Sequence, residues 1–195
     1  MDPLEQKIKK IFIKNGLLLG AILLGLSIIS FYFITAITTS PILFVAAPLF
    51  FSVVIPIIVV VMICLNGRKK IGGHWSFKQA VTGIFIMFLI AYIIQTVGRD
   101  LIFARLIEPN MIEKTETAFI NASSAIKEKA GFNQKQMDQN IADIKKNFEE
   151  QKKVTIGKTI QAIAISIIFV FIFALIFAAL FKRDAPLYDT QIDSR

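Results

Sequence analysis

The chain of 195 residues contains one cysteine and one histidine. A single cysteine, Cys64, excludes an intramolecular disulfide. With His74 as the only histidine, the sequence lacks the cysteine and histidine clusters that hold zinc, and it offers no complete set of residues for a nucleophilic active site. A glycine-rich phosphate loop is also missing. These absences favour a protein that is not an enzyme and that binds no cofactor or metal.

Charged residues are scarce as well: they make up 18% of the chain against about 25% in an average soluble domain, whereas 55% of the chain is hydrophobic. The apolar residues gather in four runs, each long enough for the roughly 20 residues that a membrane-spanning helix needs. Lys78, at the edge of the third run, is the only charged residue inside these limits. The four runs cover residues 16–39, 41–65, 77–98 and 160–181.

The four runs predict an all-α fold, an integral membrane four-helix bundle with a long extramembrane helical hairpin between spans three and four. We expect an N-terminal tail and three spans in residues 1–98, an extracytoplasmic insert in 99–153, the fourth span in 154–183 and a flexible tail in 184–195. Ion- and proton-coupled carriers usually keep charged groups within the membrane. The near absence of charge in these runs therefore disfavours a coupled carrier, although a path for a neutral solute stays open.

The first two spans are predicted to form a tight hairpin. Ser40 can cap the second helix, and Pro41 then occupies its first position, where a missing backbone N–H costs nothing. Pro48 and Pro56 lie inside the second span. Each removes a backbone donor and crowds the preceding turn, so we expect this helix to be kinked.

The distribution of lysine and arginine predicts the orientation in the membrane. The N-terminal tail carries four lysines, the loop 66–76 is also basic, and the last span ends at Lys182 and Arg183. Because positive charge stays on the cytoplasmic side, both termini are expected there, in the inner membrane of a bacterium. The insert 99–159 carries eleven basic and nine acidic residues, a balance typical of a translocated segment. Lipid headgroups, rather than nucleic acid, are the expected partners of the basic residues Arg68, Lys69 and Lys70.

Two amphipathic helices are predicted in the insert. Asn110 with Glu113, and Asn133 with Gln136, have the spacing of capping boxes, and Gly131 marks a helix end between them. The second helix is expected to run on into the fourth span. Apolar residues at helical spacing form a stripe on each helix, which we interpret as a face for a membrane or periplasmic partner protein. The stripes contain Ile112, Phe119 and Ile126 on the first helix, and Met137, Ile141, Ile144 and Phe148 on the second.

Two further features concern packing. Gly16 and Gly20 form a small-xxx-small step in the first span, which permits close approach of another helix and indicates a face for a homo-oligomer. Trp75 precedes the third span at a position that suits an interfacial aromatic residue.

Three segments resemble a family of small four-span membrane proteins from Bacteroidota, catalogued as a domain of unknown function numbered four-one-nine-nine. They are Lys-Asn-Gly-Leu-Leu-Leu-Gly-Ala at 14–21, the loop Lys-Ile-Gly-Gly-His-Trp-Ser-Phe-Lys-Gln-Ala at 70–80, and Ile-Glu-Pro at 107–109. The family typically has Asp where this chain has Glu108. The resemblance implies a fold and a compartment, and it implies no activity and no functional residue.

We therefore expect a non-enzymatic accessory subunit or scaffold for a partner protein. Three other classes stay open: a small transporter or channel that acts as an oligomer, a membrane anchor or partner of a lipid-linked enzyme, and a membrane-bound enzyme that acts on a lipid substrate at the cytoplasmic face. In the last case the cluster Arg68, Lys69 and Lys70 would clamp a phosphate group.

Overall fold

The computed structural model describes residues 3–153 and 155–184, and the predicted tail beyond Asp184 lies outside these residues. The described part consists of helices without strands, which confirms the all-α prediction. Four continuous helical segments, of 35, 30, 31 and 25 residues, are long and apolar enough to cross a membrane. In chain order the elements are α1 (Pro3–Tyr32), η1 (Phe33–Ile37), α2 (Pro41–Leu49), η2 (Phe50–Val54), α3 (Ile55–Lys70), α4 (Phe77–Gln95), η3 (Thr96–Ile107), α5 (Met111–Lys129), α6 (Gln134–Lys152) and α7 (Ile156–Phe181).

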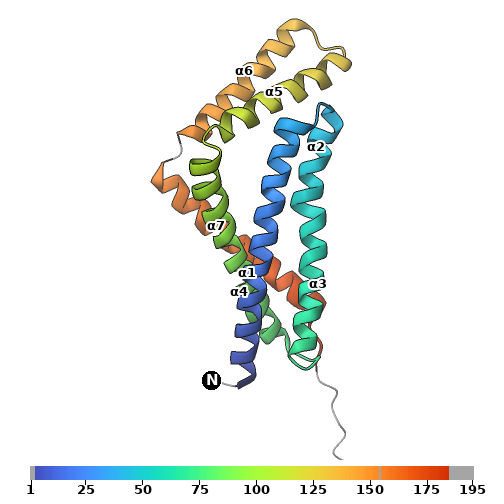
Figure 1. Cartoon of the computed structure of the whole chain (residues 1–195), viewed down its shortest axis with the longest axis vertical. Coiled ribbons are helices and arrows are strands. Elements are labelled where there is room, and N and C mark those ends of the chain that lie inside the picture. Colours follow the sequence, from blue (N-terminus) through green and yellow to red (C-terminus); the bar gives the residue numbers. More distant parts are fainter. Residues whose placement is uncertain (1–2, 154, 185–195) are drawn as a thin grey trace, which may run out of the picture.

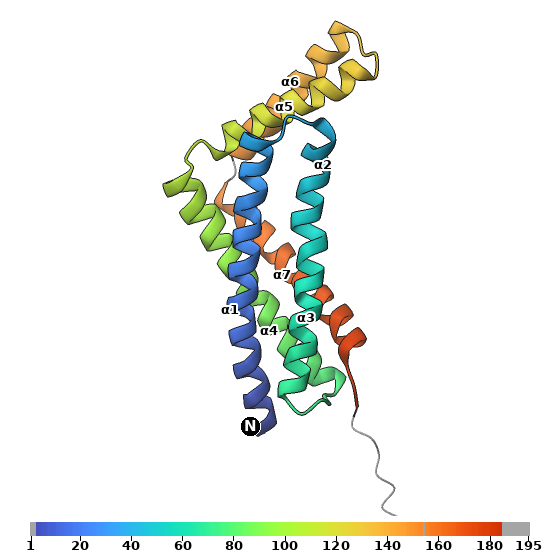
Figure 2. The same ribbon diagram turned by 45° about the vertical axis from the view of Figure 1, so that its right-hand side comes forward.

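The four spans are not a parallel-sided bundle. Figures 1 and 2 show α1 and the α2–α3 span running side by side, while α4 and α7 cross them obliquely. The α5–α6 hairpin lies across the end of the molecule farthest from the N-terminus, which we call the insert end. The opposite end holds the start of α1, the loop 71–76 and the end of α7, and we call it the basic end.

The second span is irregular where its prolines lie. Pro48 is inside α2, Pro56 is near the start of α3, and the π-helical segment η2 (Phe50–Val54) lies between them. A proline has no backbone N–H, so a carbonyl in the preceding turn loses its usual donor. A π-helical turn can pair such a carbonyl with the N–H five residues further on. The disturbance expected from these prolines thus takes the form of a wider helical turn.

The main contact inside the membrane is between α1 and α4, and glycine makes it close. A Cβ atom on Gly16 would lie 2.9 Å from the backbone oxygen of Met87, and one on Gly20 would lie 3.1 Å from the Cα of Ala91. The first distance is shorter than real Cβ contacts and the second is tighter than most of them, so a side chain at either position would push against the backbone of α4. The glycine pair predicted as a face for a second copy is therefore occupied by the chain's own third span. The spacing of the glycines predicts a close helix contact but does not identify the helix that makes it.

At the basic end, Trp75 is buried, with 2% of its surface exposed, rather than facing the membrane interface. Its ring stacks on Phe12 with centroids 5.2 Å apart. Its indole Nε1–H donates to the backbone oxygen of Phe181 at 2.7 Å, and its backbone pairs with that of Arg183. These bonds satisfy carbonyls left free at the end of α7 and hold the fourth span to the loop before α4.

Two predictions for the helix ends of the insert need correction. Helix α5 begins after Asn110 as predicted, but the Asn110 side chain makes no capping hydrogen bond. The turn before the helix is closed instead by the Met111 N–H, which donates to the Glu108 backbone oxygen at 2.9 Å. The sixth helix also does not continue into the fourth span: α6 ends at Lys152, and Thr155 caps a new helix. The capping box of Asn133 with Gln136 is confirmed, and so is the left-handed Gly131, with φ of 79°.

The contact of α1 with α4 gives a direct prediction. Gly20→Val should lower the free energy of unfolding by about 1–3 kcal/mol, because the added atoms must displace backbone or strain Ile94. Gly25→Val is the matched control, since nothing lies within 4 Å of a Cβ at Gly25. Thermal unfolding in detergent, followed by Trp75 fluorescence, measures both. Equal stability of the two variants would show that α1 and α4 do not meet through this glycine.

Candidate functional site

The loop at the basic end has the turn predicted for it. Gly72 and Gly73 have φ of 110° and 85°, values that L side chains rarely adopt. Ser76 then caps α4 in a reciprocal capping box with Gln79. The loop is thus a rigid connection between α3 and α4.

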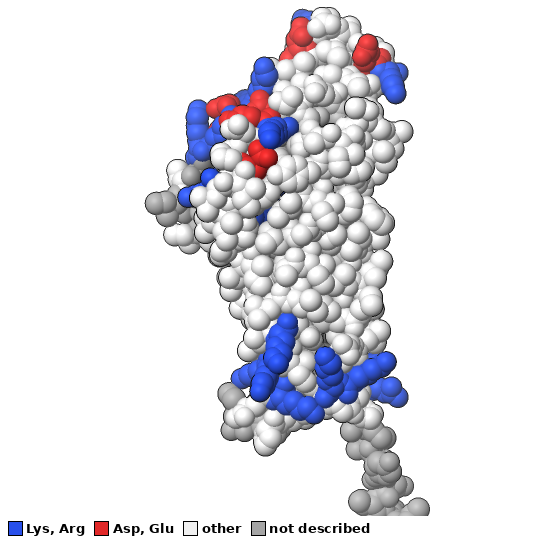
Figure 3. Space-filling model, in the orientation of Figure 1, with Lys and Arg blue, Asp and Glu red and all other residues white. Residues whose placement is uncertain are grey.

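The three basic residues predicted to contact lipid headgroups differ in exposure. Lys69 and Lys70 are exposed, whereas Arg68 is half-buried and donates to the Phe181 backbone oxygen at 3.5 Å. Figure 3 shows that lysine and arginine gather around the basic end, while acidic side chains are visible near the insert end. The arrangement offers a diffuse positive surface.

The apolar stripes on the two helices of the insert differ in their exposure. Ile112, Phe119 and Ile126 on α5 remain 39–44% exposed. On α6, Met137, Ile141 and Phe148 are half-buried and Ile144 is buried, so this stripe lies largely within the hairpin.

The hairpin is held together and is also docked onto the second span. Asn140 Nδ2 donates to Ser123 Oγ at 2.8 Å, linking α6 to α5. Phe119 lies between Phe148 of α6 and Phe44 of α2, with ring centroids 6.3 Å and 5.9 Å away. This one aromatic side chain therefore joins the hairpin to the membrane bundle.

A cluster of charge closes the base of the hairpin. Lys152 Nζ lies 2.9 Å from Glu149, 3.7 Å from Glu113 and 3.9 Å from Glu116. The hydrogen bond from Lys152 and its positive charge lower the pKa of Glu149, and the same hydrogen bond raises the pKa of Lys152. The cluster ties the end of α6 to the beginning of α5.

Glu108 connects the third span to the insert. It is 9% exposed, forms an ion pair with Lys114 at 2.7 Å and accepts a hydrogen bond from the Tyr32 hydroxyl at 3.4 Å. Tyr32 in turn packs edge-on against Phe103 of η3. Because a buried carboxylate is costly without partners, these contacts fix the direction in which α5 leaves the bundle.

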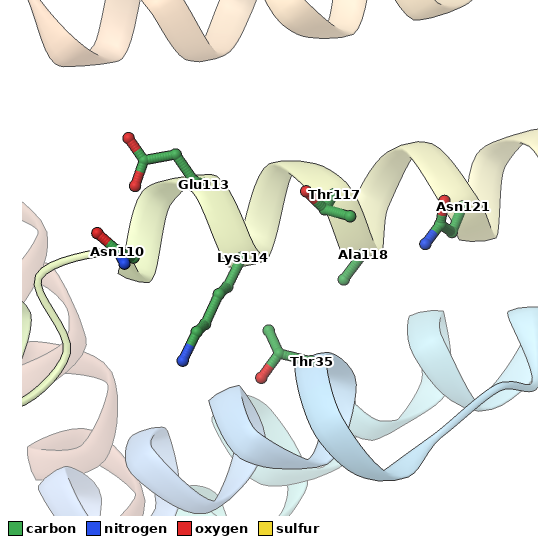
Figure 4. A pocket seen from close by; sticks show the side chains of 7 residues that line it. All are labelled: Thr35, Asn110, Glu113, Lys114, Thr117, Ala118 and Asn121. Atoms are coloured by element: carbon green, nitrogen blue, oxygen red, sulfur yellow. The ribbon is translucent and has the colours of Figure 1, made fainter.

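A polar cleft lies between α5 and the end of the first span. It consists of two hollows of about 500 Å³ and about 330 Å³, which share Thr35, Ala118 and Asn121. In Figure 4, Lys114 points from α5 towards the first span, while Glu113 points away from it, towards α6. The second hollow is also lined by hydroxyl groups of the first loop, at Thr38, Thr39 and Ser40.

The cleft combines hydrogen-bonding groups with charge, because Glu113 and Lys114 line the larger hollow. Thr35 donates to the Phe31 backbone oxygen, and Thr38 Oγ1 accepts from the Ser40 N–H. The hydroxyl oxygens and the Asn121 amide can still bond to a ligand. This site was not predicted from the sequence. The run of hydroxyl residues between the first two spans was the signal, but only the fold places it beneath α5.

These features define a multi-pass, all-helical membrane protein with a docked helical hairpin at one end. The chain matches, over residues 14–183, the family described as "Protein of unknown function (DUF4199)", and it belongs to that family. The resemblance carried by the segments 14–21, 70–80 and 107–109 is thus confirmed. Comparison with curated proteins and comparison with solved structures each found no match.

The contacts of Glu108 with Lys114 and Tyr32, which we call the Glu108 joint, predict a local effect of Lys114→Met. Loss of the cation leaves the Glu108 carboxylate without its ion pair, so the joint should weaken by about 1–3 kcal/mol. Amide hydrogen exchange in the first turns of α5 should accelerate. Lys129→Met, an exposed lysine in the same helix, is the control and should leave exchange unchanged. Unaltered exchange in Lys114→Met would mean that the ion pair does not hold the joint.

The charge cluster predicts a titration. The pKa of Glu149 in the folded protein should lie below its ordinary value of 4.5. The contribution of this pair to stability is therefore complete above pH 4.5 and is lost as the pH falls through the lowered pKa. Lys152→Gln should raise the Glu149 pKa towards 4.5, and Lys153→Gln should raise it less, because Lys153 acts only by its charge. Carbon-13 NMR of the glutamate carboxyl groups measures both, and equal shifts would contradict the hydrogen bond.

Proposed function

We propose that this protein is a non-enzymatic accessory subunit or scaffold of a membrane assembly, and that the polar cleft at the insert end receives its partner. The observation that carries the proposal is the fixed position of the hairpin over the first loop. Phe44, Phe119 and the Glu108 joint hold α5 above the loop hydroxyls at a set distance. A preformed cleft that offers hydrogen-bonding groups and the charged side chains of Glu113 and Lys114 suits a segment of another protein.

The charge distribution supports an orientation for this role. The surface at the basic end, with Lys69 and Lys70 exposed, is the end that the positive-inside rule assigns to the cytoplasm. In the bacterial inner membrane, the cleft would then open on the periplasmic side. A periplasmic protein, or the extracytoplasmic part of a membrane protein, is the proposed partner.

The proposal is tested by comparing the partner chains that co-purify with the parent protein and with a variant in which the cleft is filled. The tagged protein, purified from its native membrane in a mild detergent, should carry one other chain in fixed stoichiometry. Ala118→Trp places a large side chain in both hollows. It should reduce the amount of co-purified partner chain about tenfold, which corresponds to a loss of roughly 1.4 kcal/mol of binding free energy. Ala142→Trp, on the exposed side of α6, should retain it.

Two results would contradict this function. The first is a homo-oligomer without another chain whose proteoliposomes carry a solute flux, because that outcome identifies an oligomeric transporter or channel. The second is equal recovery of the partner by Ala118→Trp and the parent protein, which would place the binding surface elsewhere.

A further inference from the structure

A polar hollow of about 270 Å³ lies at the basic end, between the start of α1 and the start of α4. Its volume is just below about 300 Å³, the lower limit for small-molecule sites, so it is large enough for a small polar group. The residues that line it are Glu5, Ile8 and Lys9 of α1 and Lys78, Gln79 and Thr82 of α4.

The close packing of α1 on α4 fixes the shape of this hollow. A Cβ atom on Gly83 would lie 3.1 Å from Cγ2 of Ile8 and 3.0 Å from Cδ2 of Phe12, and Ile8 is only 1% exposed. The two helices therefore meet directly beside the hollow. Lys9 and Lys78, which line it from neighbouring helices, are held near each other by this contact.

The hollow lies at the boundary between the polar and the apolar part of the bundle. Lys78 is the second residue of α4, and Thr82 follows it by one helical turn. Both α1 and α4 run from the basic end towards the insert end (Figure 1), so later residues lie deeper in the membrane. Ile13 follows Lys9 by one turn on the same face of α1 and is 43% exposed. Polar groups in the hollow are thus continuous with apolar surface, as a molecule with a polar head and an apolar chain requires.

Three side chains that line the hollow can donate hydrogen bonds to an anion. Two are the ammonium groups of Lys9 and Lys78. The third is Gln79, whose Oε1 accepts from the Ser76 N–H at 2.9 Å, so that its Nε2 group remains a donor. Glu5 also lines the hollow, and two lysines and one glutamate give the lining a net charge of +1. A phosphodiester, which carries one negative charge, balances this lining.

Two side chains of the lining can accept a hydrogen bond from the same ligand. The Thr82 hydroxyl donates to the Lys78 backbone oxygen at 3.0 Å, so its Oγ1 is left as an acceptor. The Glu5 carboxylate accepts as well. Neither group suits a phosphate oxygen, but both suit a hydroxyl group close to the phosphate.

We propose that this hollow binds the phosphoglycerol headgroup of an anionic phospholipid such as phosphatidylglycerol. The phosphate lies at Lys9 and Lys78, and a glycerol hydroxyl donates to Thr82 or Glu5. Basic pockets between membrane helices are known to hold anionic headgroups. A choline headgroup has no hydrogen to donate, and an ethanolamine headgroup makes the lipid neutral and leaves the lining unbalanced. This inference is independent of the partner-binding role proposed for the cleft.

Native mass spectrometry of the full chain, titrated with lipids of identical acyl chains in a mild detergent, tests the proposal. Phosphatidylglycerol should bind about fivefold more tightly than phosphatidylethanol, because the two share the phosphodiester charge and only the first has hydroxyl groups. Phosphatidylcholine should bind more weakly than both. Soluble glycerophosphoglycerol, which is the same headgroup without acyl chains, should not displace the bound lipid at equal concentration.

Variants separate a site from diffuse attraction. Lys9→Gln and Lys78→Gln should each weaken phosphatidylglycerol binding about fivefold. Lys10→Gln removes the same charge from an exposed neighbour that does not line the hollow, and it should bind as the parent protein does. Thr82→Val should lower the affinity for phosphatidylglycerol and leave the affinity for phosphatidylethanol unchanged.

Three results would overturn the proposal. Equal losses in Lys9→Gln and Lys10→Gln would show that the lipid responds to the overall positive charge of the basic end. Equal binding of phosphatidylglycerol and phosphatidylethanol by the parent protein would show that no hydroxyl group is recognised. Displacement of the lipid by glycerophosphoglycerol would assign the hollow to a soluble phosphodiester instead.

Discussion

The close approach of α1 and α4 is the contact on which the rest of the structure depends. In a membrane the lipid tails are as apolar as the side chains, so helices associate through steric fit rather than through the hydrophobic effect. Gly16 and Gly20 provide that fit by letting the backbone around Met87 and Ala91 come near. Once these two spans are joined, α3 and α7 attach at their sides.

Much of the fold follows from local sequence signals. Four long apolar runs gave the spans, and Gly131 and the Asn133–Gln136 capping box gave the hairpin turn. Features that depend on residues far away in the sequence were not predicted correctly. The glycine pair indicates a close helix contact, but its spacing does not show that the partner is α4. Trp75 is buried because Phe12 and the end of α7 cover it, and both are far from it in sequence. The polar cleft was missed for the same reason, since its two walls come from the first loop and from α5.

The two ends of the molecule differ in physical character. The basic end is tied together by hydrogen bonds from Trp75 and Arg68 to the last turn of α7, and its exposed lysines suit an anionic membrane surface. The insert end is tied together by aromatic contact at Phe119 and by the Glu108 ion pair, and it carries the polar cleft. The two ends of the bundle are thus held together by different kinds of contact.

The docking of the hairpin on the second span can be measured directly by cross-linking. In a Cys64→Ala background, Val45→Cys and Ala122→Cys place thiols on two walls of one small hollow of about 150 Å³, and they leave the Phe44–Phe119 contact intact. A short bifunctional thiol reagent, applied to native membranes, should join this pair rapidly. It should join Val45→Cys to Ala142→Cys poorly, because Ala142 is on the exposed side of α6. Equal cross-linking of both pairs, or none in the first, would show that the hairpin is not docked and that the cleft does not exist in the membrane.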